Sequence, residues 1–163
     1  MRVSLNWIKK YIDLPKEIDA KQIAYDLTLR TVEVEAVENT EDKFHDIVVG
    51  EIKEVKAHPN ADALKICIVD VGEDELKQIV CGGSNLAEGH KVCVSKPGAE
   101  VVWHGEGEPV LIKESKLRGE KSYGMICGAT EVYLADIYPP HDEREIVDFT
   151  DLGVDCKVGQ CVA

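Results

Sequence analysis

The sequence lacks the patterns that mark membrane proteins, secreted proteins and several enzyme classes. Its 163 residues hold no apolar run near the roughly 18 residues that a membrane helix needs. The first seven residues do not have the basic and then apolar layout of a secretion signal. No nucleophile elbow, phosphate-binding loop, dinucleotide fingerprint or HExxH motif occurs. We therefore expect a cytoplasmic chain that makes no membrane contact and carries no catalytic residues.

The cysteine and histidine spacings also argue against a metal site. None of the six cysteines forms a CxxC pair, and no two histidines have the His-x-x-x-His spacing. Most of the cysteines lie in apolar runs, which is typical of small buried thiols in a reducing compartment. We predict free thiols and no metal, with Cys67, Cys81, Cys93 and Cys127 inside and only Cys156 and Cys161 exposed.

Positive charge and aromatic side chains are both scarce. The chain has 31 acidic against 19 basic residues, a net charge of −12, and aromatics make up only 6% of it. Binding of nucleic acid through overall charge requires lysines and arginines that displace counterions from phosphate, so this mode is excluded. Any nucleic-acid contact must come from a local basic patch, with base stacking as a minor part.

Short strands separated by turns dominate the stretch from residue 47 to 128. Five or six short strands with glycine-bearing turns are typical of a small barrel, because curling the sheet removes most of its open edge. Gly50 falls where such a curled sheet needs a bulge or a close approach of the backbone. The expected strands are 47–55, 64–71, 77–81, 91–95 and 110–113.

The first forty residues follow a different pattern. Ser4 can cap a short helix, Asp19 with Gln22 can cap a second one, and 31–37 alternates like a strand. This material is too small for a core of its own, so it must pack against other chain. We predict a mainly β protein, with a small N-terminal α/β segment at 1–40 and a barrel domain at 41–150. Residues 39–43 read as a polar linker between them.

The most basic window of the chain lies just before residue 125. Lys113, Lys116, Arg118 and Lys121 fall within nine residues, against Glu114 and Glu120. A guanidinium, a hydroxyl at Ser122 and the thioether of Met125 suit phosphate contact and packing against a base or a sugar. The competing interpretation is a solvated face in which the glycines only shape a turn.

Four motifs together resemble a known domain family. They are His58-Pro59-Asn60-Ala61-Asp62-x-Leu64, Gln78-Ile79-Val80-Cys81-Gly82-Gly83-Ser84-Asn85, Pro97-Gly98-Ala99 and Lys116-Leu117-Arg118-Gly119-x-x-Ser122-x-Gly124-Met125. In this order they resemble the tRNA-binding OB-fold domain of several synthetases and tRNA-binding cofactors. The opening Val3-Ser4-Leu5-Asn6-Trp7 and the Glu33-Val34-Glu35 segment resemble the bacterial phenylalanyl-tRNA synthetase beta subunit.

The resemblance implies a fold, a function and a set of contacts. The fold would be a five-stranded OB-fold barrel with elaborations, and residues 151–163 would begin a return toward the N-terminal segment. The function would be an auxiliary tRNA-binding module without catalysis of its own. Its partners would be tRNA, specifically tRNA-Phe, and the alpha subunit, while ATP and Mg²⁺ would act in other parts of the parent enzyme. The contact set would comprise Lys65, Asn85, Lys116, Arg118, Lys121, Ser122 and Met125.

Two departures and two alternatives remain open. The family has glycine where this chain has Thr31 and Tyr133, which leaves both local turns in question. The barrel could instead be a docking module for subunit assembly, which the acidic balance favours, or a free-standing tRNA-binding protein with the same fold.

Overall fold

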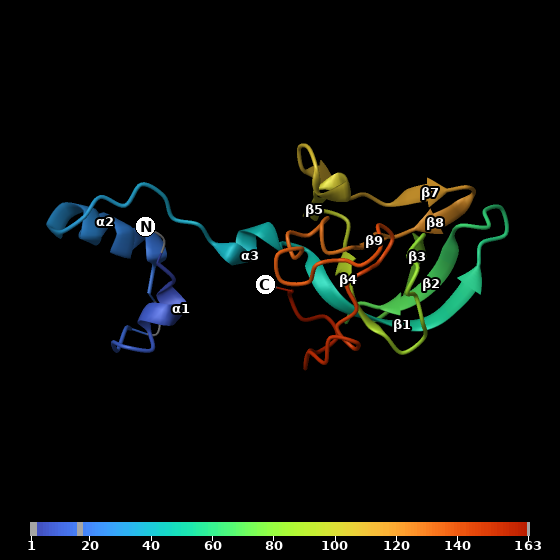
Figure 1. Ribbon diagram of the computed structural model, residues 1–163, viewed down its shortest axis with the longest axis horizontal. Coiled ribbons are helices and arrows are strands. Elements are labelled where there is room, and N and C mark those ends of the chain that lie inside the picture. Colours follow the sequence, from blue (N-terminus) through green and yellow to red (C-terminus); the bar gives the residue numbers. More distant parts are fainter. Residues whose placement is uncertain (1–2, 16–17, 163) are drawn as a thin grey trace. The chain divides into compact units, whose positions relative to one another are not determined.

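The computed structural model describes residues 3–15 and 18–162, without the side chains of residues 40 and 41. The chain divides into two compact units, Met1–Asn39 and Thr40–Ala163 (Figure 1). Within the described residues, no helix is long and apolar enough to cross a membrane. The first unit contains α1 (Leu5–Ile8) and α2 (Ala20–Arg30). The second contains α3 (Thr40–Lys43), β1 (Ile47–Ala57), β2 (Lys65–Asp70), β3 (Lys77–Cys81), β4 (Lys91–Ser95), β5 (Glu100–Val101), η1 (Trp103–Gly105), β6 (Val110–Leu111), β7 (Ser115–Leu117), β8 (Glu120–Ser122) and β9 (Met125–Ile126).

The two helices of the first unit begin where the sequence predicts. The Ser4 side chain accepts a hydrogen bond from the Trp7 N–H at 3.4 Å, and Asp19 accepts one from the Lys21 N–H at 2.9 Å. The strand predicted at 31–37 is wrong, because residues 32–39 have no regular structure. Alternation of side chains cannot reveal whether a partner strand is available, and no described strand pairs with this segment.

The second unit is built on one antiparallel sheet that curls into a nearly closed barrel. The strand order is β3-β2-β1-β4-β9, and β3 comes back into contact with β9. The long strand β1 serves both halves of the barrel, since its first part pairs with β4 and its second part with β2. The mainly β barrel fold predicted from the sequence is confirmed. The predicted linker 39–43 is instead largely α3, which opens this unit.

Two features of β1 allow it to curl. The register with β2 shifts between Ile52 and Glu54, which is a β-bulge, and bulges bend a strand and increase its twist. A Cβ atom on Gly50 would lie 2.7 Å from the Val94 Cγ2 and 2.8 Å from the Val69 Cγ1. Only glycine allows the strands to approach this closely, as the sequence predicts for Gly50.

The sheet is covered on both faces at its centre. One core cluster fills the barrel and includes Ile52, Val69 and Val94. A second cluster packs the outer side of β1 and β4 against the long segment after β9, with Val49, Cys93 and Phe149 among its members. Because both faces are buried, the centres of β1 and β4 read as continuous apolar runs rather than as alternating ones.

The fifth barrel strand is not the one that the sequence predicts. Residues 110–111 pair only with β5, in a separate two-stranded sheet, and β9 takes the fifth place beside β4. A Cβ on Gly124 would lie 2.3 Å from the Ser95 carbonyl oxygen, so glycine is required where the chain enters β9. A two-residue strand is too short to show a period of its own.

The segment after β9 wraps the barrel and ends along β1. The Val49 N–H donates to the Gln160 carbonyl at 2.9 Å, and the Gly159 N–H donates to the Val49 carbonyl at 2.8 Å. We call residues 159–162 the closing segment. It satisfies backbone groups on the free side of β1 and so protects an edge of the sheet. The predicted division into 41–150 and 151–163 stays a prediction.

The cysteines are all free thiols. Cys67, Cys93 and Cys127 are buried, Cys81 is half-buried and Cys161 is exposed, as predicted. Cys156 is buried, which corrects the expectation that it is exposed. The Lys91 ammonium donates to the Cys156 carbonyl at 2.6 Å, so that the segment around Cys156 is held against β4.

Candidate nucleic-acid interface

The basic window of the sequence forms a tight β-hairpin. Strands β7 and β8 pair in antiparallel register, and only Arg118 and Gly119 connect them. Both residues have positive φ angles, 52° and 100°. A two-residue connection with two positive φ angles is a type I′ turn, whose twist matches that of the flanking strands. The turn thereby fixes the position of the Arg118 side chain at the hairpin tip.

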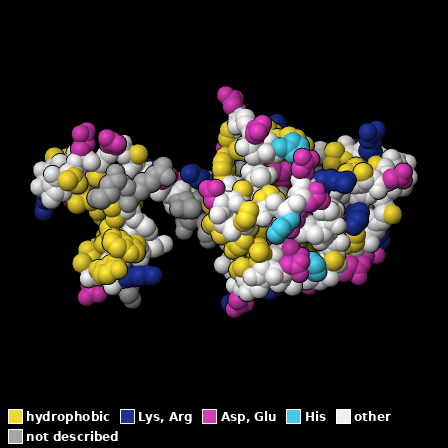
Figure 2. All heavy atoms as spheres, viewed as in Figure 1, with side chains coloured by type: hydrophobic (Ala, Val, Ile, Leu, Met, Phe, Trp, Pro, Cys, Tyr) yellow, Lys and Arg dark blue, Asp and Glu magenta, His cyan; other side chains and the backbone are white. Residues whose placement is uncertain are grey.

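The hairpin brings three exposed cations close together along the chain. Lys116 and Lys121 are directly opposite in the register, and Arg118 follows at the tip. All three side chains are exposed, and no ion pair joins them to a described carboxylate. Figure 2 shows Lys and Arg side chains projecting from the part of the barrel where Figure 1 draws β7 and β8. Free cations at one place are what an anionic ligand requires.

Several other lysines of the barrel are neutralised locally. Lys53 pairs with Glu51 at 2.8 Å and Lys56 with Glu54 at 2.8 Å. Lys77 and Lys96 both contact Glu73, at 3.3 Å each. Although burial acts to raise the pKa of the Glu73 carboxyl, the hydrogen bonds and charges of these two lysines hold it below its ordinary value. The hairpin therefore stands out as a local positive patch on an acidic protein.

Contacts to β3 hold the hairpin against the barrel. The Gln78 side chain donates from Nε2 to the Lys121 carbonyl at 2.8 Å and to the Glu120 carboxylate at 3.3 Å. The Tyr123 N–H donates to the Gln78 carbonyl at 2.9 Å. The bond to Lys121 goes to its backbone carbonyl, so the Lys121 ammonium is not used by it.

Two residues that sequence reasoning left out hold the hairpin tip from the other side. The Asn60 Nδ2 donates to the Arg118 carbonyl at 3.2 Å, and the His58 Nε2 lies 3.1 Å from the Leu117 carbonyl. His58 is only 6% exposed, and its Nδ1 accepts from the Asn60 N–H at 3.1 Å, so it is a buried histidine that caps its own turn. The only sequence signal was its place in the His58-Pro59-Asn60 motif. The motif does not reveal that the bonding partner of His58 is Leu117, 59 residues further along the chain.

Two residues of the predicted contact set have side chains that are bonded within the fold. Ser122 is buried, its Oγ accepts from the Val80 N–H at 3.0 Å and donates to the Gly124 carbonyl at 2.8 Å. The Asn85 amide binds both backbone groups of Ile146, at 3.0 Å and 2.9 Å. Ser122 is fully engaged inside the fold, whereas the half-buried Asn85 uses its amide to hold the segment at Ile146.

The remaining two predicted residues lie on the barrel itself. Lys65 is the first residue of β2, directly after the loop that carries His58 and Asn60, and it is half-buried. Met125 is half-buried in β9 and packs against the outer core cluster. Lys65 therefore lies directly after the loop that bonds to the hairpin tip, whereas Met125 offers only part of its thioether side chain.

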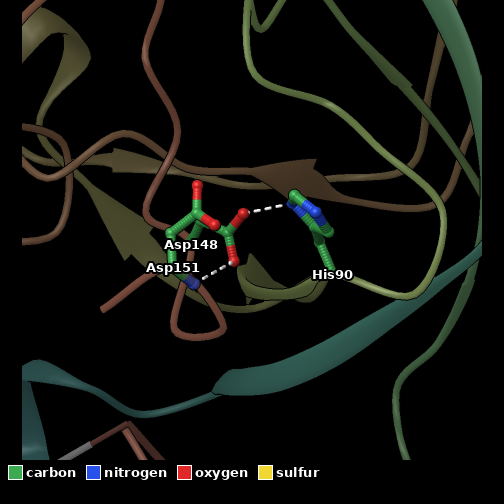
Figure 3. Close-up of side chains that lie close together, drawn as sticks. All are labelled: His90, Asp148 and Asp151. Atoms are coloured by element: carbon green, nitrogen blue, oxygen red, sulfur yellow. Dashed lines mark hydrogen bonds and ion pairs between the residues drawn. The ribbon is translucent and has the colours of Figure 1, made fainter. Parts of the chain in front are cut away.

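A second polar cluster lies among His90, Asp148 and Asp151 (Figure 3). Their potential ligand atoms lie within 4.8 Å of one another, a spacing that a metal ion could use. The His90 Nδ1 faces one Asp148 oxygen at close range. The other Asp148 oxygen accepts from the Thr150 N–H at 2.9 Å and the Asp151 N–H at 3.4 Å. The two N–H bonds make this oxygen of the buried Asp148 an anchor for the turn that follows it in the wrapping segment.

The fold and the hairpin together define a class of protein. A small barrel with one long bulged strand shared by both halves, and with free cations beside it, has the architecture of an OB-type nucleic-acid-binding domain. The chain belongs to the family described as "Putative tRNA binding domain", which matches residues 47–151.

Curated relatives narrow the family further. The chain is 41% identical over 163 residues to the phenylalanine–tRNA ligase beta subunit of Chlorobaculum tepidum, covering 100% of this chain and 19% of that protein. It is 45% identical over 132 residues to the same subunit of Geobacillus kaustophilus, covering 81% of this chain and 16% of that protein. The chain thus spans less than a fifth of the length of these relatives.

A solved structure supports the fold alone. The MetRS related protein of Pyrococcus horikoshii matches with a TM-score of 0.50 at 18% identity, over 78% of this chain and 99% of that one. At this identity the likeness concerns the arrangement of strands and not the ligand.

Proposed function

We propose that this chain is an auxiliary tRNA-binding module of a phenylalanine–tRNA ligase beta subunit, which helps to bind or place tRNA for aminoacylation. The observation that carries the proposal is the hairpin on which Lys116, Arg118 and Lys121 are exposed and form no ion pair with any carboxylate that the structure describes. The match to the tRNA-binding family and the identity to the beta subunits support it.

The chemistry of the contact follows from the side chains. Lysine ammonium groups act as point charges toward phosphate, and the Arg118 guanidinium can hold two phosphate oxygens at once. The contact set is Lys65, Lys116, Arg118 and Lys121, with Met125 packing against a base or a sugar. Such contacts bind the RNA backbone and carry little sequence information, so selection of tRNA-Phe would depend on other parts of the parent protein.

Binding of fluorescently labelled tRNA to this chain tests the proposal. The variant Lys116→Ala/Lys121→Ala removes two free cations, and Lys53→Ala/Lys56→Ala is a matched control that removes two lysines already paired with glutamates. Both doubles change the net charge equally. We expect the first to weaken binding at least about tenfold at low salt and the second to have little effect. Equal effects of the two doubles would reject the hairpin as the tRNA contact.

Docking within a larger assembly is the second candidate function. None of the described residues of the first unit is buried, and Trp7, Tyr11 and Leu29 are among its exposed large apolar side chains. Light scattering of this chain mixed with an alpha subunit from the same synthetase tests it. A complex that Trp7→Ser/Tyr11→Ser disrupts would support docking, and tRNA binding without any complex would count against it.

The finer parts of the proposal concern the whole parent protein. We propose tRNA-Phe and the alpha subunit as its partners, the cytoplasm as its location, and ATP with Mg²⁺ as reactants bound outside this chain. The names of the relatives support tRNA-Phe and the alpha subunit as partners.

A further inference from the structure

The loop between β1 and β2 forms a small hydrogen-bonded unit with the hairpin tip. The Asn60 N–H donates to the His58 Nδ1 at 3.1 Å, so Nδ1 carries no proton and the neutral imidazole has its proton on Nε2. That Nε2–H then donates to the Leu117 carbonyl. The Asn60 amide donates to the next carbonyl, that of Arg118. Two consecutive carbonyls of the tip are thus held by two side chains of one loop.

The hairpin needs such support because its own sequence works against it. Strands of three residues form a hairpin that is marginal in isolation. Lys116 and Lys121 are like charges placed directly opposite, which is unfavourable in a strand pair. Arg118 occupies a left-handed position that favours Asn, Asp or Gly. The features that make the hairpin a cation cluster therefore also weaken it.

We propose that His58 and Asn60 are positioning residues, which hold the hairpin tip in the conformation that presents Lys116, Arg118 and Lys121 to the RNA backbone. This inference rests on the proposed function. Neither side chain is required to contact tRNA, since both bond to backbone carbonyls of the tip. Their effect is to keep the tip ordered before binding, so that binding does not have to order it.

The variant Asn60→Ala is the sharpest test. Asn60 is exposed, so truncation leaves the core clusters unchanged, and its Nδ2 is the group that bonds to the Arg118 carbonyl. The matched control is Asn6→Ala, the same truncation at an exposed position of the first unit. A further variant, His58→Gln, keeps a donor at the position of Nε2 and should retain more binding than His58→Ala.

Two measurements separate positioning from plain stability. Amide hydrogen exchange without tRNA should become faster at the hairpin residues 116–121 in Asn60→Ala, while the amides of β1 and β4 keep their protection. Binding of labelled tRNA should weaken about two- to tenfold, the factor expected when a turn and its side chains must be ordered on binding. The melting temperature should stay within a few degrees of that of the unchanged chain.

The outcomes distinguish this inference from the function on which it rests. Unchanged exchange at residues 116–121 in Asn60→Ala would overturn the positioning role. Faster exchange with unchanged tRNA affinity would also overturn it, provided that Lys116→Ala/Lys121→Ala still weakens binding. If that double leaves affinity unchanged as well, the proposed function itself fails, and the positioning role falls with it.

Discussion

The salt dependence of tRNA binding gives the most quantitative prediction. The perturbation is the triple variant Lys116→Ala/Arg118→Asn/Lys121→Ala, in which Asn is chosen because it tolerates the positive φ of the turn. We assume that Lys65 and these three residues each neutralise one phosphate, which makes four contacts. A plot of the logarithm of the association constant against the logarithm of the salt concentration then has a slope of about −2.8 to −3.6. Affinity then drops about 50- to 150-fold between about 50 and 200 mM salt.

The triple variant should retain a single cation contact. Its slope should be about −0.7 to −0.9, and its affinity should fall only about threefold over the same range. The assay is fluorescence anisotropy of labelled tRNA at several salt concentrations, with circular dichroism to check the fold. Lys53→Ala/Lys56→Ala should keep the original slope because both lysines are already paired. A triple variant with the slope of the unchanged chain would refute the assignment of these contacts.

Three further predictions concern stability and reactivity. Burial raises the pKa of the Glu131 carboxyl, although the hydrogen bond from the Gly128 N–H acts to lower it. The folded chain therefore favours the protonated carboxyl, which stabilises the fold fully below the unfolded pKa of about 4.3, and this stabilisation is lost as pH rises through the raised pKa. Glu131→Gln should therefore gain stability relative to the unchanged chain between about pH 4 and pH 7 in urea unfolding, and a relative loss would contradict this sign. Tyr133→Gly should raise stability by about 0.5–1 kcal/mol in thermal unfolding, because Tyr133 has a φ of 59° in a position suited to glycine; a lower melting temperature would argue against strain there. Alkylation of the native chain near pH 8 should modify the exposed Cys161 first, since burial raises the pKa of Cys67 to about 11 and of Cys81 to about 12, and mass spectrometry showing equal modification would oppose it.

The sequence predicts the barrel well where local pattern and burial agree. The strands around Val49, Val69 and Val94 have apolar runs that end in turns, and all of them form as expected. The sequence does not predict the fifth strand, because β9 is only two residues long and depends on the close approach of Gly124 to Ser95. The segment 31–37 has the alternation of a strand but no described partner, and pairing is not a local property.

The same limit applies to the candidate site. Residue type and spacing identify the cation cluster, because three lysines and an arginine within nine residues are visible in the sequence. Which polar side chains turn inward depends on partners far along the chain, such as Val80 for Ser122 and Ile146 for Asn85. For His58 the sequence underestimates the residue instead. Its hydrogen bond to the distant Leu117 carbonyl holds the hairpin, and the residues next to His58 in the sequence do not reveal this bond.

The Tyr133 position shows how a departure from the family pattern is absorbed. The Leu134 N–H donates to the Ala129 carbonyl at 2.8 Å, which is the bond of a Schellman-type turn whose left-handed residue is Tyr133. The turn therefore forms with tyrosine at the left-handed position, where the resemblance implied glycine. Burial of Val132 and Leu134 on either side holds the turn in place.

The closing segment affects when the barrel can form during synthesis. The Val162 N–H donates to the carbonyl of Ile47, the first residue of β1. The ribosome synthesises Ile47 long before Val162. The free side of β1 therefore stays uncovered until more than a hundred further residues have been made. Such distant contacts form slowly, and an uncovered strand can pair with other chains in the meantime. During synthesis, the hydrogen bonds of β1 are therefore completed only when the closing segment has been made.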